Sequence, residues 1–340
     1  MPAAPKYFTN NSAIFVGSRT EEGLPFVPTN LMNSIIWSSM ARAKMHYPTI
    51  SVCGFIFMLN HFHMLLVVED PEQVSSFVGY IKQEMAHAVN RLLGRRQKTI
   101  WKSEYDSPRI LDSVKALEIL TYIYMNPVQA GLVESIMDYP GVSSWEILNK
   151  NQRKCWRPYF TRDNIQQLIN PAQPKYEDEK ALAKLLESSK MSCLLEYSPF
   201  AWKKCFEDTK DTPDEELKAA LLLKIKEAEA DLVRERIKNN QTVAGRDSLL
   251  SSSMIRQYNP KKHGRKTICL ASDKKLRIEF ITFFKDLCRK ARYVYNCWKN
   301  FDFSLSYPLG LFAPAFPRVA NRLHSQAFLD DDLGGKLIFC

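Results

Sequence analysis

The chain has 340 residues and a formal net charge of +10, a length that exceeds one typical domain and a charge that favours a polyanionic partner. No apolar run approaches the roughly twenty residues of a membrane span, which excludes a membrane protein of the helical kind. The eight cysteines form no CxxC pair and residues 1–6 lack a secretory pattern, so we expect reduced cysteines, no zinc ribbon and a cytoplasmic location.

Hydrophobic periodicity predicts an α+β arrangement in the first 146 residues. The expected strands are residues 12–20, 50–58, 61–69 and 105–111, and the expected helices are residues 30–45, 72–93 and from 113 onward. The order β-α-β-β-α-β with one added helix is the ferredoxin-like arrangement. In it the strand 61–69 lies in mid-sheet, with helices on one face and the other face left for DNA and for the last helix.

Two histidines one residue apart, His61 and His63, occupy the start of the second strand of a pair. Because side chains alternate along a strand, both imidazoles project from one face while Phe62 and Met64 project from the other. Two neutral imidazoles at this spacing can bind one divalent metal ion. A pair of half-buried histidines at a sheet edge explains the same pattern, and the motif alone does not decide between them.

The helix that starts at Ser113 supplies a candidate nucleophile. Helical spacing puts Glu118, Tyr122 and Asn126 in one row, and puts Tyr124 in a mostly apolar row where it is expected to be core. Asn126 lies one turn beyond Tyr122, so its amide oxygen could be a third metal ligand. Alternatively, Asn126 only ends the helix before Pro127, which is expected to disturb it, while Asp112 or Ser113 caps its start.

These two segments carry a specific resemblance. Residues 58–66 read MLNHFHMLL and residues 122–133 read YIYMNPVQAGLV, a combination that resembles the single-tyrosine HUH transposases of the IS200-like superfamily, in their REP-associated branch. Further matches lie at Asn90-Arg91, Trp101, Tyr105, Tyr139-Pro140 and residues 143–145. Leu59 and Gln129 depart from the family, which usually has proline and arginine there. The resemblance covers roughly residues 8–146.

The resemblance implies a reaction. His61 and His63 would hold Mg²⁺ or Mn²⁺ with Asn126, and Tyr122 would cleave single-stranded, hairpin-bearing DNA to leave a 5′-phosphotyrosine and a free 3′-hydroxyl. A different 3′-hydroxyl could then rejoin the strands without ATP, and the protein would act as a monomer or a homodimer. Two other functions stay open: a nucleic-acid-binding module or repressor that has lost cleavage, and a nicking enzyme of the replication-initiator or relaxase kind.

Basic residues mark two further candidate DNA contacts. The helix 72–93 and its exit carry five that could track phosphates or simply be solvated: Lys82, Arg91, Arg95, Arg96 and Lys98. Residues 256–300 hold thirteen Lys or Arg against three Asp or Glu, and they include a basic turn with Lys261, Lys262, Arg265 and Lys266 and a helix over 272–298. Aromatic residues in that helix could stack bases or be core.

The remaining sequence gives only a domain outline. Residues 1–146 form the expected catalytic domain, residues 147–255 a helical region with linkers, and residues 256–340 a basic helical segment with a proline-rich tail. Within the middle region, residues 176–189 and 212–239 are expected to be paired amphipathic helices, and residues 240–253 a linker.

Overall fold

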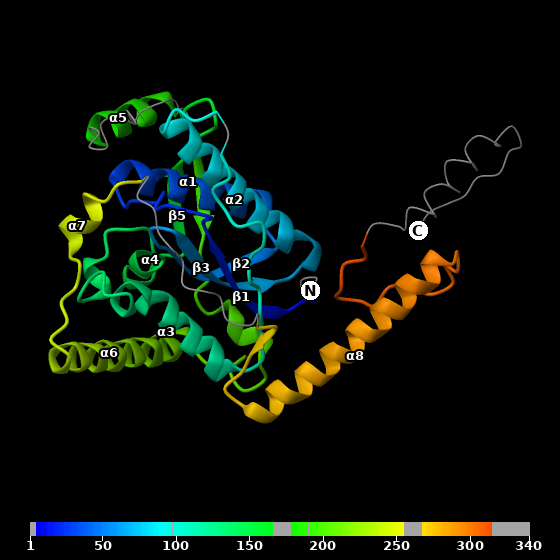
Figure 1. Ribbon diagram of the computed structural model, residues 1–340. Coiled ribbons are helices and arrows are strands. Elements are labelled where there is room, and N and C mark those ends of the chain that lie inside the picture. Colours follow the sequence, from blue (N-terminus) through cyan, green and yellow to red (C-terminus); the bar gives the residue numbers. More distant parts are fainter. Residues whose placement is uncertain (1–4, 97, 166–177, 190, 255–266, 315–340) are drawn as a thin grey trace, which may run out of the picture. The chain divides into compact units, whose positions relative to one another are not determined.

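The computed structural model describes residues 5–96, 98–165, 178–189, 191–254 and 267–314 (Figure 1). Contacts divide the chain into two units, residues 9–273 and a second made of residues 1–8 with residues 274–340. The residues expected as a separate helical region, 147–255, lie in the same unit as residues 9–146. Among the described residues no helix is both long and apolar enough to span a membrane.

One five-stranded sheet organises the larger unit. Its strands are β1 (Ser12–Arg19), β2 (Ile50–Phe57), β3 (His61–Val68), β4 (Arg109–Ile110) and β7 (Cys269–Leu270), in the spatial order β2-β3-β1-β4-β7. Neighbours are antiparallel except β4 and β7, which are parallel. The first three strands match the prediction within two residues, whereas the expected strand 105–111 is only two residues long. The α+β class is confirmed, and β3 lies between two partners as expected.

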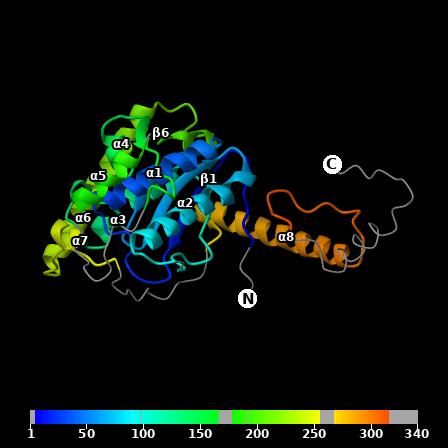
Figure 2. The same cartoon turned by 90° about the horizontal axis from the view of Figure 1, so that it is seen from above.

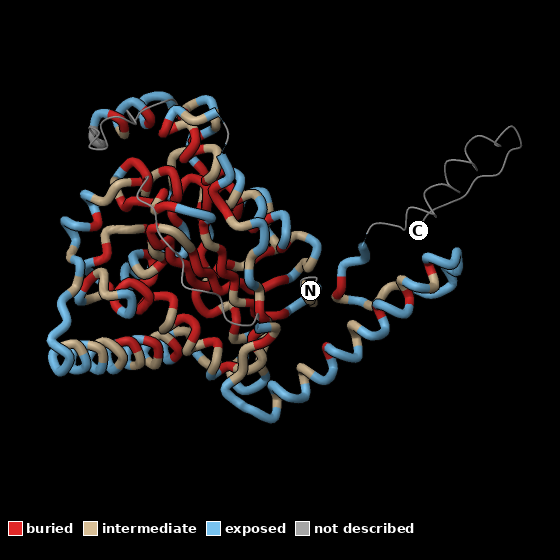
Figure 3. The backbone as a smooth tube through the Cα atoms, viewed as in Figure 1, coloured by how far each residue is buried: buried red, intermediate tan, exposed pale blue. Residues whose placement is uncertain are grey.

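Helices lie on both faces of this sheet (Figure 1). The helices α1 (Asn30–His46) and α2 (Pro71–Leu92) pack together on one face, and Figure 2 shows them side by side. The apolar side chains that recur every three or four residues along α2 are fully buried: Val74, Phe77, Val78, Ile81, Met85, Ala88, Val89 and Leu92. Helix α3 (Ser113–Gln129) lies on the other face, and α6 (Asp214–Lys238) packs against α3. The buried residues gather in the sheet and in α1 (Figure 3).

Helix α3 begins as predicted but continues three residues further. The Asp112 carboxylate accepts a hydrogen bond from the Lys115 backbone N–H at 2.6 Å and caps the helix. Pro127 does not end it. The helix ends at Gln129, and the turn that stops it contains Gly131, whose φ of 66° favours glycine and whose N–H donates to the Val128 carbonyl. The expectation of a helix ending at Asn126 was wrong because the terminator is Gly131 and a proline near a helix end removes only one backbone bond.

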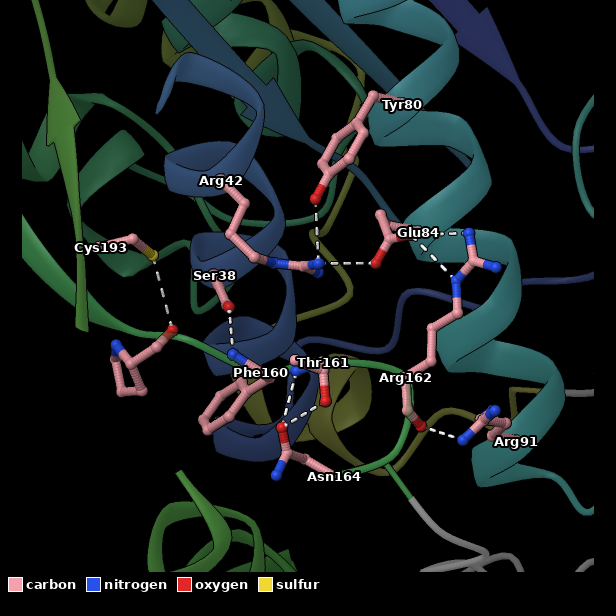
Figure 4. A network of polar contacts seen from close by, with 11 residues as sticks. Ser38, Arg42, Tyr80, Glu84, Arg91, Phe160, Thr161, Arg162, Asn164 and Cys193 are labelled. Carbon is pink, nitrogen blue, oxygen red and sulfur yellow. Dashed lines mark hydrogen bonds and ion pairs between the residues drawn. The ribbon is translucent and has the colours of Figure 1, made fainter. Parts of the chain in front are cut away.

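A buried ion-pair network joins the helices on the first face (Figure 4). The Glu84 carboxylate of α2 lies 2.7 Å from the Arg42 guanidinium of α1 and 3.0 Å from that of Arg162. Arg42 and Glu84 are each under one tenth exposed. Burial alone would raise the pKa of Glu84, but the hydrogen bonds and charges of the two arginines outweigh it and lower that pKa. Removing both arginines would leave the buried Glu84 carboxylate without an opposite charge.

The middle of the chain contains strands that the periodicity did not predict. β5 (Lys154–Pro158) and β6 (Ser192–Glu196) form an antiparallel two-stranded sheet that packs on α1. The expected helices are present as α5 (Asp178–Ser188) and α6, but they do not pack against each other as predicted. Instead, α5 packs on α1 and α6 packs on α3. The other elements here are η1 (Ile136–Asp138), α4 (Trp145–Asn149), η2 (Ala201–Cys205) and α7 (Arg246–Leu250).

The expected linker 240–253 is not free chain. It contains α7, and the backbone N–H groups of Ala244 and Gly245 bond the carbonyls of Gly131 and Leu132 at 2.9 Å. These bonds attach it to the turn that follows α3. The expectation failed because a polar segment can be ordered by backbone hydrogen bonds, which composition does not reveal.

The smaller unit is built on helix α8 (Lys274–Lys299), which confirms the helix expected over 272–298. The Tyr7 ring packs against Phe280, Phe283 and Phe284 of α8, with ring centroids 5.9 to 6.1 Å apart. After the helix, the chain returns so that the Phe8 backbone N–H bonds the Gly310 carbonyl at 3.0 Å. The part of the proline-rich tail beyond residue 314 lies outside the described residues.

Candidate active site

The two histidines lie on the face of the sheet that carries α3, in the strand that has partners on both sides. In the register of β1 and β3, Gly17 is opposite His63 and Arg19 is opposite His61. The Asn60 side-chain oxygen lies 2.8 Å from Nδ1 of His61. An Nδ1–H donating to that oxygen leaves the Nε2 lone pair of His61 available for a metal ion. His63 is 9% exposed, so the pair is not at a sheet edge.

Tyr122 of α3 faces His63, from which it is 59 residues away in sequence. Its phenol oxygen lies 3.4 Å from Nε2 of His63, and the two rings are 5.3 Å apart. The Phe15 ring of β1 stacks on His63 at 5.1 Å and meets Tyr122 edge-on at 5.9 Å. Phe15 therefore forms a wall that holds both rings in place. The structure brings together the tyrosine and the histidines that the sequence predicted as partners.

Asn126 completes this group. Its side chain lies close enough to both His61 and Tyr122 to raise the pKa of the first and lower the pKa of the second, and it is 7% exposed. One turn of helix separates it from Tyr122, so the position follows directly from the row that the sequence predicted. The reading of Asn126 as a helix terminus alone does not account for these contacts.

Burial keeps both histidines neutral. It lowers the pKa of His61 to about 4, helped by the charge of Arg19 and opposed by the Asn126 hydrogen bond. The pKa of His63 is also lowered well below its ordinary value by burial, by His61 and by Arg19. Burial raises the pKa of Tyr122, although Asn126 and Arg19 act in the opposite direction. Neutral imidazoles have the lone pairs that metal binding requires.

The donor set fits a divalent ion. Two neutral imidazoles and an amide side chain converge here, and Nδ1 of His63 is buried with no hydrogen-bond partner, so the His63 ring in particular has a nitrogen that no protein group uses. In the described part of the chain no three His, Cys, Asp or Glu side chains come together as a metal cluster. A site on this face would therefore depend on a ligand outside those four types, and Asn126 is placed to supply it.

A cleft of about 610 Å³ opens beside His63 on this face. Arg19 and Lys102 contribute positive charge to its lining, and Glu21, Glu104 and Asp106 contribute negative charge. Arg19 is the residue of this site that the sequence did not indicate. Its position opposite His61 depends on the pairing register of β1 and β3, which periodicity does not supply.

Tyr124 and Glu118, the other residues of the predicted helix rows, lie outside this group. Tyr124 is core as expected: it is 1% exposed, its hydroxyl lies 2.8 Å from that of Tyr197, and burial raises its pKa to about 12. Glu118 pairs with Lys115 at 2.5 Å. Lys115 therefore neutralises the one carboxylate in the row of Tyr122.

The predicted DNA-contacting basic residues are spread over several structural roles. The Lys82 ammonium donates to the Lys102 carbonyl at 2.8 Å, and burial lowers its pKa. Arg91 hydrogen-bonds the Arg162 carbonyl, whereas Arg95 is half-buried and Arg96 is exposed. The basic turn with Lys261, Lys262, Arg265 and Lys266 lies outside the described residues.

Several of the motif residues have structural roles. The Tyr139 hydroxyl donates to the Phe57 carbonyl at 2.7 Å, and Ser144 Oγ accepts from the Phe55 N–H at 2.9 Å. The Trp101 indole donates to the Lys82 carbonyl at 2.8 Å. These bonds attach loops to the sheet and to α2, so these motif residues stabilise the fold and take no part in the group around Tyr122.

Comparison with known proteins identifies one curated relative, and no family model matches. A putative REP-associated tyrosine transposase of Haemophilus influenzae is 26% identical over 106 residues, which cover 28% of this chain. The chain spans 58% of that relative's length. A solved structure of a REP-associated tyrosine transposase bound to a REP hairpin matches 44% of this chain and 86% of its own, at 20% identity and a TM-score of 0.38.

The relative confirms the resemblance of this chain to tyrosine transposases. Within that class the resemblance is to the REP-associated branch, as the motifs predicted.

Proposed function

We propose that this protein is a metal-dependent DNA transposase that cleaves and rejoins single-stranded, hairpin-bearing DNA through Tyr122. The observation that carries the proposal is the meeting of Tyr122 with His63, 3.4 Å apart, beside His61 and Asn126. The likeness to a curated relative named as a tyrosine transposase supports the same reaction class. We assign the strand order β4-β1-β3-β2, with its β-α-β-β-α-β sequence, to the ferredoxin-like arrangement, and we place the protein in the cytoplasm.

Tyr122 Oη would attack the scissile phosphorus, forming the phosphotyrosine bond as the bond to the 3′-oxygen breaks. The phenol loses its proton, and the departing 3′-oxygen gains one. Rejoining reverses these steps when another 3′-hydroxyl attacks the phosphotyrosine. A Mg²⁺ or Mn²⁺ ion held by His61, His63 and Asn126 would supply Lewis-acid polarisation of the phosphate.

The other residues of the site would make the phenol a better nucleophile. Burial holds the pKa of Tyr122 above its ordinary value, which disfavours the phenolate. Arg19 and Asn126 both lower that pKa, so they would stabilise the phenolate as it forms. Arg19 also lines the cleft, where its guanidinium could contact a phosphate. Phe15 would keep the His63 and Tyr122 rings aligned.

The test is a covalent adduct on a denaturing gel. The protein is mixed with labelled hairpin oligonucleotides taken from the DNA that flanks its gene, with Mn²⁺ or Mg²⁺. We expect an adduct that disappears with chelator, with His61→Ala and with Tyr122→Phe, and that persists with Tyr124→Phe. Tyr124→Phe is the matched control because it makes the same chemical change two residues away. Metal-independent binding without an adduct would instead support a non-catalytic nucleic-acid-binding module.

A further inference from the structure

Helix α8 has one side that is already occupied within its own unit. The buried residues of α8 are Phe284, Ala291, Val294 and Trp298. The Tyr7 ring packs on this side near the start of the helix, and near its end the Trp298 indole donates to the Leu305 carbonyl at 3.0 Å and lies 5.6 Å from the Tyr307 ring. The apolar side therefore has intramolecular partners at both ends.

A second side of α8 is basic and exposed. The helix holds eight Lys or Arg and two acidic residues, a net charge of +6 in 26 residues. At about 100° per residue, Lys274, Lys285 and Arg292 lie within about 20° of one another and about 120° around the helix from the centre of the apolar side. All three are exposed, as are Lys299 and Arg289 beside them, and Arg289 also pairs with Asp286 at 3.0 Å. Figure 3 shows the exposed character of this helix along its length.

The length of this basic row suits an extended polyanion. Lys274 and Arg292 are 18 residues apart, which in an α-helix is about 27 Å. Tyr293 lies on the rim of the row, four residues after Arg289, and its side chain is 64% exposed. A row of cations with an exposed aromatic ring beside it can bind both the phosphates and the bases of a single strand.

We propose that the basic side of α8, defined by Lys274, Lys285, Arg289, Arg292 and Lys299, is a second binding surface for single-stranded DNA, with Tyr293 stacking on a base. The choice of single-stranded DNA rests on the proposed function. An anionic membrane is the less favoured partner, because a membrane-bound amphipathic helix inserts its apolar side, and on that side of α8 Tyr7 packs against Phe284 and Tyr307 packs against Trp298. The surface would bind by charge, without reading sequence.

The experiment measures binding rather than cleavage. Full-length chain carrying Tyr122→Phe, which cannot form an adduct, is titrated with oligothymidine at several salt concentrations, and affinity is followed by fluorescence anisotropy. The test variant adds Lys274→Gln, Lys285→Gln and Arg292→Gln. The matched control adds Lys224→Gln, Lys226→Gln and Lys238→Gln on α6, which removes the same charge from another helix.

The expected result is a change in the salt dependence. Each phosphate contact with a single strand contributes about 0.7 to the slope of log affinity against log salt, so the α8 variant should lose about 2 in that slope. The α6 control should keep the parent slope. Tyr293→Leu should weaken binding about fivefold or more and leave the slope unchanged, because stacking is not ionic.

The proposed α8 surface would be refuted if the α8 variant had the same salt slope for oligothymidine as the α6 control. It would also be refuted if the α8 substitutions weakened binding to phosphatidylglycerol vesicles and left binding to DNA unchanged. The two proposals fail separately. A wild-type chain that binds oligothymidine through α8 but forms no adduct would refute the transposase chemistry alone. An adduct that forms while the slopes stay equal would refute the α8 surface alone.

Discussion

Gly54 sets how closely the tyrosine helix approaches the sheet, and Gly54→Ala tests this directly. A Cβ at Gly54 would lie 2.5 Å from Cδ2 of Leu120, a residue of α3 that is fully buried. Carbon atoms in contact are about 3.5–4.0 Å apart, so the overlap is about 1 to 1.5 Å. Overpacking of this kind costs about 1–3 kcal/mol. Part of this is offset, because an unfolded chain with alanine has less conformational entropy to lose on folding than one with glycine, which stabilises the folded protein by about 0.4–1 kcal/mol. We expect a net loss of about 1–2 kcal/mol.

Urea denaturation measures this loss, and Gly79→Ala is the matched control. Gly79 lies in α2, exposed and with nothing within 4 Å of its Cβ position, so alanine there should raise the free energy of unfolding by about 0.5–1 kcal/mol. Gly54→Ala should also slow adduct formation, because a displaced α3 carries Tyr122 away from His63. Combined with Leu120→Ala, its cost should be less than additive. A Gly54→Ala protein as stable as wild type would refute the close packing of α3.

Three further changes probe the site itself. Burial lowers the pKa of His61 to about 4, so between pH 6.5 and 4 the unfolded chain protonates this imidazole while the folded protein does not. The metal-free protein should therefore lose about 3 kcal/mol of its free energy of unfolding as the pH falls over this range. Urea melts at several pH values measure the loss, and His61→Gln combined with His63→Gln should make the dependence on pH flatter. Gly17→Ala would place a Cβ 3.2 Å from Nδ1 of His63, so calorimetry should show Mn²⁺ affinity falling about tenfold with the fold intact; unchanged affinity would contradict the contact. Arg19→Gln should lower the rate of adduct formation by about 10²-fold and move its pH profile upward, since Arg19 lowers the pKa of Tyr122; an unshifted profile would remove Arg19 from the account.

Local periodicity predicted the parts of the site that lie within one element. Alternation along the strand placed His61 and His63 on one face, and helical spacing placed Tyr122 and Asn126 in one row with Tyr124 in the core. These predictions need only the geometry of a strand or a helix.

The features that periodicity missed depend on contacts between distant segments. Arg19 and Gly17 enter the site through the register of β1 against β3. The two strands β5 and β6 have only five residues each, which is too short to show a clear hydrophobic period, and they pack on α1. The end of α3 was misplaced because Pro127 is a stronger local signal than Gly131, although the positive φ of Gly131 terminates the helix.

The identity of the residue that carries DNA tests the central claim most directly. After reaction with a hairpin oligonucleotide and Mn²⁺, the adduct is digested with nuclease and protease, and the modified peptide is sequenced by mass spectrometry. The account predicts one nucleotide remnant joined through a 5′-phosphate to Tyr122. A remnant on Tyr124 or on any other side chain would contradict the assignment of the nucleophile and of the site built around it.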